Sequence, residues 1–285
     1  MFQLERDRYL REFSTFGIGG PIQLFAAISS IQQMEEAFTF IRTEKIPYLI
    51  IGKGSNCLFD DRGFKGLVLL NKIDFCEYDQ LRVTAGAGFS FSLLGVHTAR
   101  KGLSGLEFAS GIPATVGGSV FMNAGANGQD VANCLESVLY LTEEGEKIVV
   151  NKQEFSFSYR TSSFQQMRGA ILSATFLLHS EQTARPTQLK ILGYRLKTQP
   201  YKEKSAGCIF RNPAPDLPAG LLIDQCGLKG LCVGDARVSE MHANFIVNGG
   251  KARAEDVLAL ISKIRSQVAE KTGVLLEPEV RVIHE

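Results

Sequence analysis

Residues 111–127, GIPATVGGSVFMNAGAN, decide how this chain is interpreted. The stretch is rich in glycine, alanine and serine without being a repeat, so its backbone amides carry little side-chain cover. Glycine permits the positive φ angles that turn several N–H groups toward one point, and it lets a ligand approach the backbone closely. We therefore interpret this stretch as a loop that binds phosphate.

A second loop of this kind, IGKGSN at residues 51–56, follows an apolar run at residues 48–51. The pattern predicts a strand at 22–28, a helix from residue 31 that Ser30 caps, and a strand at 48–51, so the loop ends a β-α-β unit. Either loop alone could be a tight turn between strands. Two such loops in one chain favour a ligand with more than one phosphate.

The composition excludes several classes of protein. The chain has 285 residues, 45% of them hydrophobic and 21% charged, as in a globular protein with a large core. A formal net charge of +1 predicts no bulk attraction to nucleic acid or to a membrane surface. Neither a signal peptide nor an apolar run of ~20 residues is present, so we expect a cytoplasmic protein without a membrane partner.

The cysteines give no metal or disulfide pattern. None of the six lies in a CxxC pair or has the spacing of zinc ligands, so we expect no metal. Scattered thiols in a chain of this size are typical of a reducing cytoplasm. The cysteines lie at positions 57, 76, 134, 208, 226 and 232.

Periodicity predicts the remaining elements. The helices are expected at 91–101, 189–198 and 253–271, the last closed by Gly273. A polar segment with Pro186, residues 179–188, is expected to be a linker. Strands are expected at 66–70, 81–85, 138–141, 147–150, 171–178 and, interrupted at Pro278, 274–283; those at 138–141 and 147–150 form a hairpin.

Two segments carry side chains suited to charge and proton transfer. Arg160 lies in SYRTS, and a guanidinium binds carboxylate or phosphate with two parallel hydrogen bonds. Cys208 follows Ala-Gly in SAGCIFRNP, and a sterically open thiol can donate a proton. The alternatives are a surface arginine and a small buried hydrophobic cysteine.

Two further segments place polar side chains among apolar ones. In LEPEVR, strand alternation would put Glu277 and Glu279 on one face, and a carboxylate turned toward a core usually has a partner or a role. In MHANFIVN, alternation would put His242 and Asn244 on one side of a strand. The alternatives are a solvated edge strand and a structural histidine.

Taken together, the motifs resemble the UDP-N-acetylenolpyruvoylglucosamine reductase family in its shorter, type II form. IGKGSN, GIPATVGGSVFMNAGA, SYRTSSF, SAGCIFRNP and LEPEVR occur in the family's order, and the resemblance runs from residue 15 to Arg281. It implies an α+β protein with an FAD-binding fold of the vanillyl-alcohol oxidase type, not a Rossmann fold. Residues 1–183 would bind FAD in two subdomains, about 1–75 and 76–183, and residues 184–285 would form an α/β substrate domain.

The resemblance also implies the ligands and the reaction. FAD would be bound non-covalently, NADPH would be the reductant, and a UDP-sugar with an enolpyruvyl group would become UDP-N-acetylmuramate, a peptidoglycan precursor. We expect a monomer with these small-molecule partners. FAD would contact Gly52, Lys53, Gly54, Ser55, Asn56, Gly111, Ile112, Pro113, Gly117, Gly118, Asn123, Gly125 and Ala126.

The same resemblance assigns roles to the polar residues. Arg160 would stabilise the charge that develops on the substrate carboxylate, Cys208 would protonate C2, and Glu279 would polarise the carboxylate. Many members of the family have serine where this chain has Cys208. The substrate would also contact Tyr159, Tyr201, Lys202, Asn212, His242 and Arg281.

The chain departs from the family pattern at two places. GIPATVGG, with Ala114 and Thr115, replaces GIPGSVGG, and alanine adopts positive φ only at a cost. His242 stands where some members have glutamine. Two alternatives stay open from the residues: another FAD oxidase of the same fold, and a nucleotide-binding module without turnover.

Overall fold

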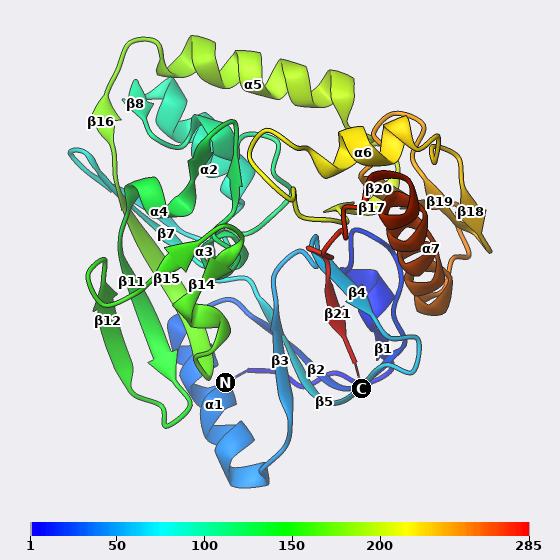
Figure 1. Ribbon diagram of the computed structural model, residues 1–285. Helices are drawn as coiled ribbons and strands as arrows, with labels where there is room; N and C mark the ends of the chain where they lie inside the picture. Colours follow the sequence, from blue (N-terminus) through cyan, green and yellow to red (C-terminus); the bar gives the residue numbers. More distant parts are fainter. Residues whose placement is uncertain (1, 285) are drawn as a thin grey trace. The chain divides into compact units, whose positions relative to one another are not determined.

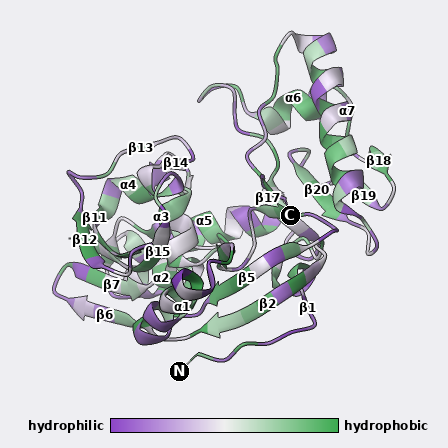
Figure 2. Ribbon diagram, turned by 90° about the horizontal axis from the view of Figure 1, so that it is seen from below, coloured by the Kyte–Doolittle hydropathy of each residue, from purple (hydrophilic) through white to green (hydrophobic). Residues whose placement is uncertain are grey.

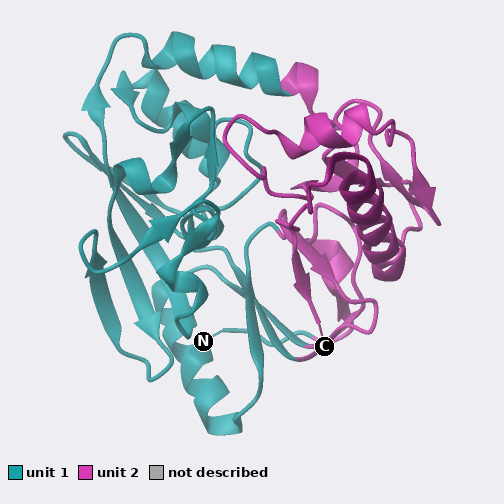
Figure 3. Cartoon of the chain, in the orientation of Figure 1, with its two compact units in different colours: residues 1–5, 24–53, 66–195 teal, residues 6–23, 54–65, 196–285 magenta. Residues whose placement is uncertain are grey.

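The computed structural model describes residues 2–284, which form two compact units (Figures 1 and 3). Within the described residues, unit 1 comprises 2–5, 24–53 and 66–195, and unit 2 comprises 6–23, 54–65 and 196–284. The boundary expected at residues 183 and 184 falls inside unit 1, and two short N-terminal segments cluster with the C-terminal part. The division into a cofactor domain and a substrate domain stays a prediction.

The first sheet of unit 1 contains the predicted β-α-β unit. β2 (Pro21–Ile28), β5 (Phe64–Asn71) and β3 (Tyr48–Ile51) lie in that order, with β3 parallel to β5. α1 (Ile31–Glu44) joins β2 to β3, and Ser30 caps it by accepting the Gln33 N–H. Thus the loop that begins at Gly52 follows a strand, as the apolar pattern predicts.

The second sheet of unit 1 is antiparallel, in the order β12-β11-β15-β7-β6. The predicted hairpin of β11 and β12 is confirmed, with Val138 opposite Val150. Its strands are β6 (Cys76–Asp79), β7 (Arg82–Gly86), β11 (Leu135–Thr142), β12 (Lys147–Asn151) and β15 (Gly169–Leu177).

β15 separates two hydrophobic cores. Ile171 packs with α2 (Phe91–Arg100) and α3 (Val116–Phe121), whereas its neighbour Leu172 packs with the buried residues of α1. Successive side chains of a strand point to opposite faces, so a strand buried on both faces reads as a continuous apolar run. α3, which carries the glycine-rich segment, is therefore anchored directly on this sheet.

Short elements complete unit 1. The paired strands are β8 (Leu103–Ser104) with β16 (His179–Ser180), β9 (Gly125–Ala126) with β10 (Gln129–Asp130), and β13 (Phe157–Ser158) with β14 (Thr161–Ser162). The short helices are α4 (Val131–Cys134), η2 (Glu107–Ala109) and η3 (Ser163–Gln165).

The linker expected at residues 179–188 is wrong. β16 occupies its first two residues, and α5 (Ala184–Thr198) begins four residues later. Pro186 lies in the first turn of α5, where a backbone N–H has no partner within the helix, so a residue without one is tolerated.

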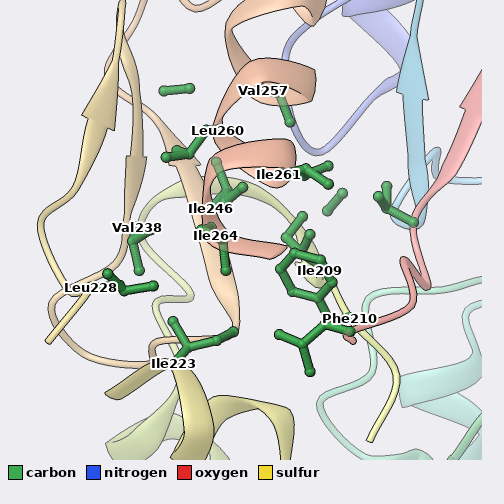
Figure 4. Packing of buried hydrophobic residues seen from close by; sticks show 14 of the residues in the cluster. Ile209, Phe210, Ile223, Leu228, Val238, Ile246, Val257, Leu260, Ile261 and Ile264 are labelled. Atoms are coloured by element: carbon green, nitrogen blue, oxygen red, sulfur yellow. The ribbon is translucent and has the colours of Figure 1, made fainter. Parts of the chain in front are cut away.

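Unit 2 is built on the antiparallel sheet β17-β20-β19-β18. Its core joins this sheet to α6 and α7, and Figure 4 shows Ile261 and Ile264 of α7 among these residues. The elements are β17 (Lys204–Cys208), α6 (Ala219–Gln225), β18 (Cys232–Val233), β19 (Ala236–Val238), β20 (Phe245–Asn248), α7 (Ala254–Thr272), β1 (Arg8–Tyr9), η1 (Leu10–Phe13), and the parallel pair β4 (Cys57–Phe59) and β21 (Arg281–Ile283).

α7 matches its prediction closely. Val257, Ile261, Ile264 and Val268 are buried on one face, and hydrophilic residues alternate with hydrophobic ones along the helix (Figure 2). Gly273 ends the helix with a φ of 73°, a conformation that favours glycine. Among residues 2–284, no helix has both the length and the apolarity needed to cross a membrane.

Two strand predictions need correction: the interruption at Pro278 is confirmed, but residues 274–277 before it form no strand, and neither do residues 241–244. The C-terminal segment forms a strand only from Arg281, because Pro278 lacks an N–H for the ladder and makes an isolated bridge with Phe210. His242 and Asn244 precede β20 and lie in a turn closed by the Asn244 N–H, which donates to His242 Nδ1 at 3.2 Å.

Replacing Ile264 by alanine tests the packing of α7. The side chain is 1% exposed, so Ile264→Ala should lower the free energy of unfolding by about 2–5 kcal/mol. Leu258→Ala, on the same helix at 39% exposure, is the control and should cost no more than about 1 kcal/mol. Urea denaturation followed by circular dichroism measures both, and equal losses would contradict this core assignment.

Candidate active site

The two glycine-rich loops meet inside unit 1. A Cβ atom added to Gly52 would lie 2.4 Å from Oγ1 of Thr115, so this contact excludes every side chain larger than that of glycine. Thr115 caps α3, since its Oγ1 accepts the Gly118 N–H at 3.3 Å. Ala114 is not among the residues with positive φ, so its replacement of the usual glycine causes no backbone strain.

The loops differ in the donors that they offer. The Gly111 N–H donates to Ser92 Oγ at 2.8 Å and the Gly117 N–H to Ala87 O at 2.9 Å, so both are engaged within unit 1. The Lys53 N–H has no acceptor among the described residues, and its Nζ lies 3.2 Å from Ser90 Oγ. An amide and an ammonium group beside a glycine suit a phosphate, as FAD requires.

Asn123 ties the second loop to a neighbouring hairpin. Its Nδ2 donates to Ser158 O at 3.0 Å and to Asp130 Oδ2 at 3.1 Å, and its Oδ1 accepts the Ala132 N–H at 3.1 Å. The side chain is 2% exposed. Asn123 therefore shapes the loop through its side chain, which leaves only its backbone to face a ligand.

Arg160 occupies an unusual backbone conformation. Tyr159 and Arg160 connect β13 to β14, and Arg160 has a φ of 57°. This position in a two-residue turn is normally taken by glycine or asparagine. The left-handed conformation costs a residue with a Cβ roughly 1–2 kcal/mol, and strain of this size gathers at functional sites.

The Arg160 side chain is held in place. Its Nη2 donates to Gly125 O at 3.0 Å, and its guanidinium carbon lies 4.9 Å from the centre of the Tyr159 ring. Gly125 and Ala126 form β9, in the second glycine-rich loop. The predicted catalytic arginine is therefore bonded to the predicted cofactor loop.

In unit 2, three segments far apart in the sequence meet around Glu279. The Glu279 N–H donates to Ile209 O at 2.7 Å, and Asn56 Nδ2 donates to Glu279 O at 3.3 Å. The Arg281 N–H donates to Asn56 O at 3.0 Å. We call this arrangement the Glu279 junction; it joins the end of the first glycine-rich loop to the Cys208 and Glu279 segments.

Two buried hydrophobic side chains hold residues 276–280 at the Glu279 junction. Leu276 is fully buried and Val280 is 5% exposed, so the residues between them are held against the core of unit 2. Arg265 of α7 donates from Nε to Leu276 O at 2.9 Å. Glu277 is exposed and Glu279 half-buried, so the two carboxylates do not share one environment.

A bulge in β17 orients Cys208. The pairing of β17 with β20 is irregular between Ser205 and Cys208, and Gly207 has a φ of 74°. A Cβ atom at Gly207 would lie 3.9 Å from Ser55 O, so the bulge passes close to the Glu279 junction. Bulges commonly redirect a side chain at a site.

Cys208 lines a cavity of about 310 Å³ in unit 2. Asn212 and His242, both predicted to bind substrate, line the same cavity, whereas Tyr201 and Lys202 lie on an exposed turn and do not. Asn212 Oδ1 accepts the Ala219 N–H at 3.1 Å, which orients its amide. The other lining residues are Pro218, Gly220, Leu221, Asp224, Lys229, Met241, Ala243 and Asn244.

His242 is a neutral donor in this cavity. Because its Nδ1 accepts the Asn244 N–H, the proton of the neutral ring lies on Nε2. Burial lowers the pKa of His242, the nearby Lys229 lowers it further, and Asp224 opposes this shift. Asn244 itself is structural, since its side chain pairs with the backbone of Phe210 at 2.9 and 2.8 Å.

Lys229 is a cavity residue that the sequence motifs do not identify. Its Nζ lies 2.8 Å from Asp224 Oδ2 at the end of α6, and both residues line the cavity. A lysine in the sequence CGLKG belongs to no motif, so only its place in the fold reveals it. The described residues contain no cluster of His, Cys, Asp and Glu that could hold a metal ion.

Gly52→Ala tests the contact between the two loops. The added methyl group would displace Thr115 from the cap of α3. We therefore expect FAD to bind at least about tenfold more weakly, so that the variant loses FAD on gel filtration. Gly193→Ala is the control, because nothing lies within 4 Å of a Cβ atom there. Unchanged FAD content in Gly52→Ala would contradict a binding role for this loop.

Comparisons with known proteins identify the family. Residues 22–151 match the model of an FAD binding domain, and residues 199–283 match the C-terminal domain of UDP-N-acetylenolpyruvoylglucosamine reductase. The chain is 53% identical over 282 residues to the reductase of that name from Protochlamydia amoebophila, covering 99% of this chain and 94% of the relative. It is 47% identical over 283 residues to the one from Chlamydia pneumoniae, covering 99% and 92%.

A solved structure agrees. The UDP-N-acetylenolpyruvylglucosamine reductase of Thermus caldophilus has a TM-score of 0.84 and 39% identity, and the match covers 99% of each chain. The predicted α+β fold, the FAD cofactor and the enzyme class are confirmed, and the alternative of a module without turnover is wrong. The chain belongs to the UDP-N-acetylenolpyruvoylglucosamine reductase family of FAD-binding oxidoreductases.

Proposed function

We propose that this enzyme uses NADPH to reduce UDP-N-acetyl-3-O-(1-carboxyvinyl)glucosamine to UDP-N-acetylmuramate, in the cytoplasm, as a step of peptidoglycan precursor synthesis. The observation that carries this proposal is the cavity of unit 2, where a thiol, an imidazole and an ammonium group come together. The names of the relatives support the substrate.

The cavity suits the anionic part of a sugar nucleotide. Lys229 supplies a positive charge, and the Nε2–H of His242 supplies a neutral donor. Asp224 lowers the net positive charge of the cavity, because its carboxylate pairs with the Lys229 ammonium group at 2.8 Å. A diphosphate would compete for this ammonium group, so binding of substrate should loosen the Lys229–Asp224 pair.

Residues 52 and 53, with the segment that Thr115 caps, would hold the cofactor. When bound, FAD would supply hydride transfer from NADPH to C3 of the enolpyruvyl group. The residues of this chain must then stabilise the negative charge on the substrate and deliver a proton to C2.

Arg160, Glu279 and Cys208 divide these tasks. The Arg160 guanidinium stabilises the charge that develops on the substrate carboxylate. Glu279, held by the Glu279 junction, polarises the same carboxylate. Cys208 gives its proton to C2, forming the C–H bond as the S–H bond breaks, and the thiolate regains a proton from solvent. A thiol is a stronger acid than the serine hydroxyl that other members use.

Accessibility separates Cys208 from buried thiols. Burial raises the pKa of Cys134 to about 12, which leaves that thiol a structural residue of unit 1. Cys208 is half-buried and faces the cavity. An acid that serves turnover must reach both substrate and solvent, and the exposure of Cys208 to the cavity supports this role.

Anaerobic absorbance spectroscopy tests the proposed reaction as a whole. NADPH should bleach the yellow enzyme, and the enolpyruvyl sugar nucleotide should restore the colour with formation of UDP-N-acetylmuramate. Bleached enzyme that only oxygen reoxidises would contradict the proposal and favour an oxidase.

Glu279→Gln separates the two half-reactions. Because Glu279 is assigned to the substrate carboxylate, this change should slow oxidation of the reduced enzyme by substrate roughly 10²- to 10³-fold and leave reduction by NADPH nearly intact. Stopped-flow absorbance measures both rates. Glu277→Gln is the control, since that carboxylate is exposed. Equal slowing of both half-reactions would show instead that Glu279 docks the C-terminal segment.

Variants of Cys208 test the proton donor. Cys208→Ala should bind the sugar nucleotide and accept electrons from NADPH normally, but its substrate half-reaction should fall sharply because no acid protonates C2. Cys208→Ser should retain more activity, since a hydroxyl occupies nearly the same place. If Cys208→Ala reacts with substrate at the parent rate in stopped flow, the acid is another group.

A further inference from the structure

Hydrogen bonds from the Gln165 side chain converge on the β13–β14 hairpin of unit 1, whose turn carries Arg160. Gln165 Nε2 donates to Phe121 O at 2.9 Å and to Arg160 O at 3.1 Å. A primary amide nitrogen has two protons, so both are used, one on each segment. Gln165 therefore links the end of α3 to the turn residue that carries the guanidinium.

The Arg160 conformation needs such a link. An arginine with a φ of 57° is disfavoured by its own Cβ, and strained residues persist only where their surroundings hold them. The strands on either side are fixed separately: Asn123 Nδ2 donates to Ser158 O at 3.0 Å, and Ser162 Oγ donates to Phe121 O at 2.7 Å. The bond from Gln165 is made to the carbonyl of the strained residue itself.

We propose that Gln165 is a positioning residue for the reaction: it holds the peptide of Arg160 in the left-handed conformation and so aims the guanidinium. This inference rests on the role of Arg160 under the proposed function. No motif of the sequence points to Gln165. A turn that relaxed to an ordinary conformation would move the base of the arginine side chain, and a displacement of about 1 Å can cost 10²-fold in rate.

Gln165→Met tests this proposal, because methionine has a similar length and no N–H donor. We expect the rate at saturating substrate to fall roughly 10- to 100-fold, while reduction by NADPH stays within about twofold. Gln166→Met is the matched control: Gln166 is the exposed neighbour, and the change should leave both rates unchanged. Gln165→Lys, which restores N–H donors at a similar reach, should recover part of the lost rate.

A readout independent of turnover is hydrogen–deuterium exchange of the peptide that contains residues 157–162. In Gln165→Met this peptide should exchange faster, with no change in a peptide from α7. Parent exchange and a parent substrate rate in this variant would overturn the proposal. So would equal slowing of both half-reactions, which would indicate a general structural role.

Arg160→Ala separates failure of this inference from failure of the proposed function. If Arg160→Ala reacts with substrate at the parent rate, the assigned role of Arg160 is wrong, and the positioning role falls with it. If Arg160→Ala is slow and Gln165→Met is not, the proposed function stands and only the positioning role is wrong.

Discussion

The hydrogen bond from the Glu279 N–H to Ile209 O, at 2.7 Å, is the constraint on which the Glu279 junction depends. This bond fixes the backbone of Glu279 beside Ile209, the residue that follows Cys208. The burial of Leu276 and Val280 holds the segment that contains Glu279 against the core, so the stability of unit 2 and the position of Glu279 have the same origin. Packing of apolar side chains thus determines where the polar group of Glu279 lies.

In unit 1, the position of the Arg160 side chain depends on a strained backbone conformation. Arg160 occupies a turn position that its side chain disfavours, and hydrogen bonds from neighbouring segments offset that cost. Arginine where turn chemistry calls for glycine is a local conflict between sequence and conformation. Such conflicts are expected where function, rather than folding, selects the residue.

Much of this arrangement could be predicted from sequence. Periodicity located α7 and the β11–β12 hairpin because their faces are buried at regular intervals. It failed at residues 179–188, because a proline in the first helical turn looks the same as one in a linker. It also failed around His242, where a turn takes the place of alternation, and at Lys229, which lines the cavity only because of the fold. The α+β fold and the family followed from motif order, whereas the αL conformation of Arg160 had no signal in the sequence.

The central claim is that the cavity with Cys208 binds the sugar nucleotide. Alkylation with iodoacetamide, followed site by site with mass spectrometry, tests it directly, because exposed Cys232 is an internal control in the same chain. Without NADPH no turnover occurs, and the enolpyruvyl substrate should slow modification of Cys208 at least about tenfold while Cys232 reacts as before. Equal modification of Cys208 with and without saturating substrate would contradict the account.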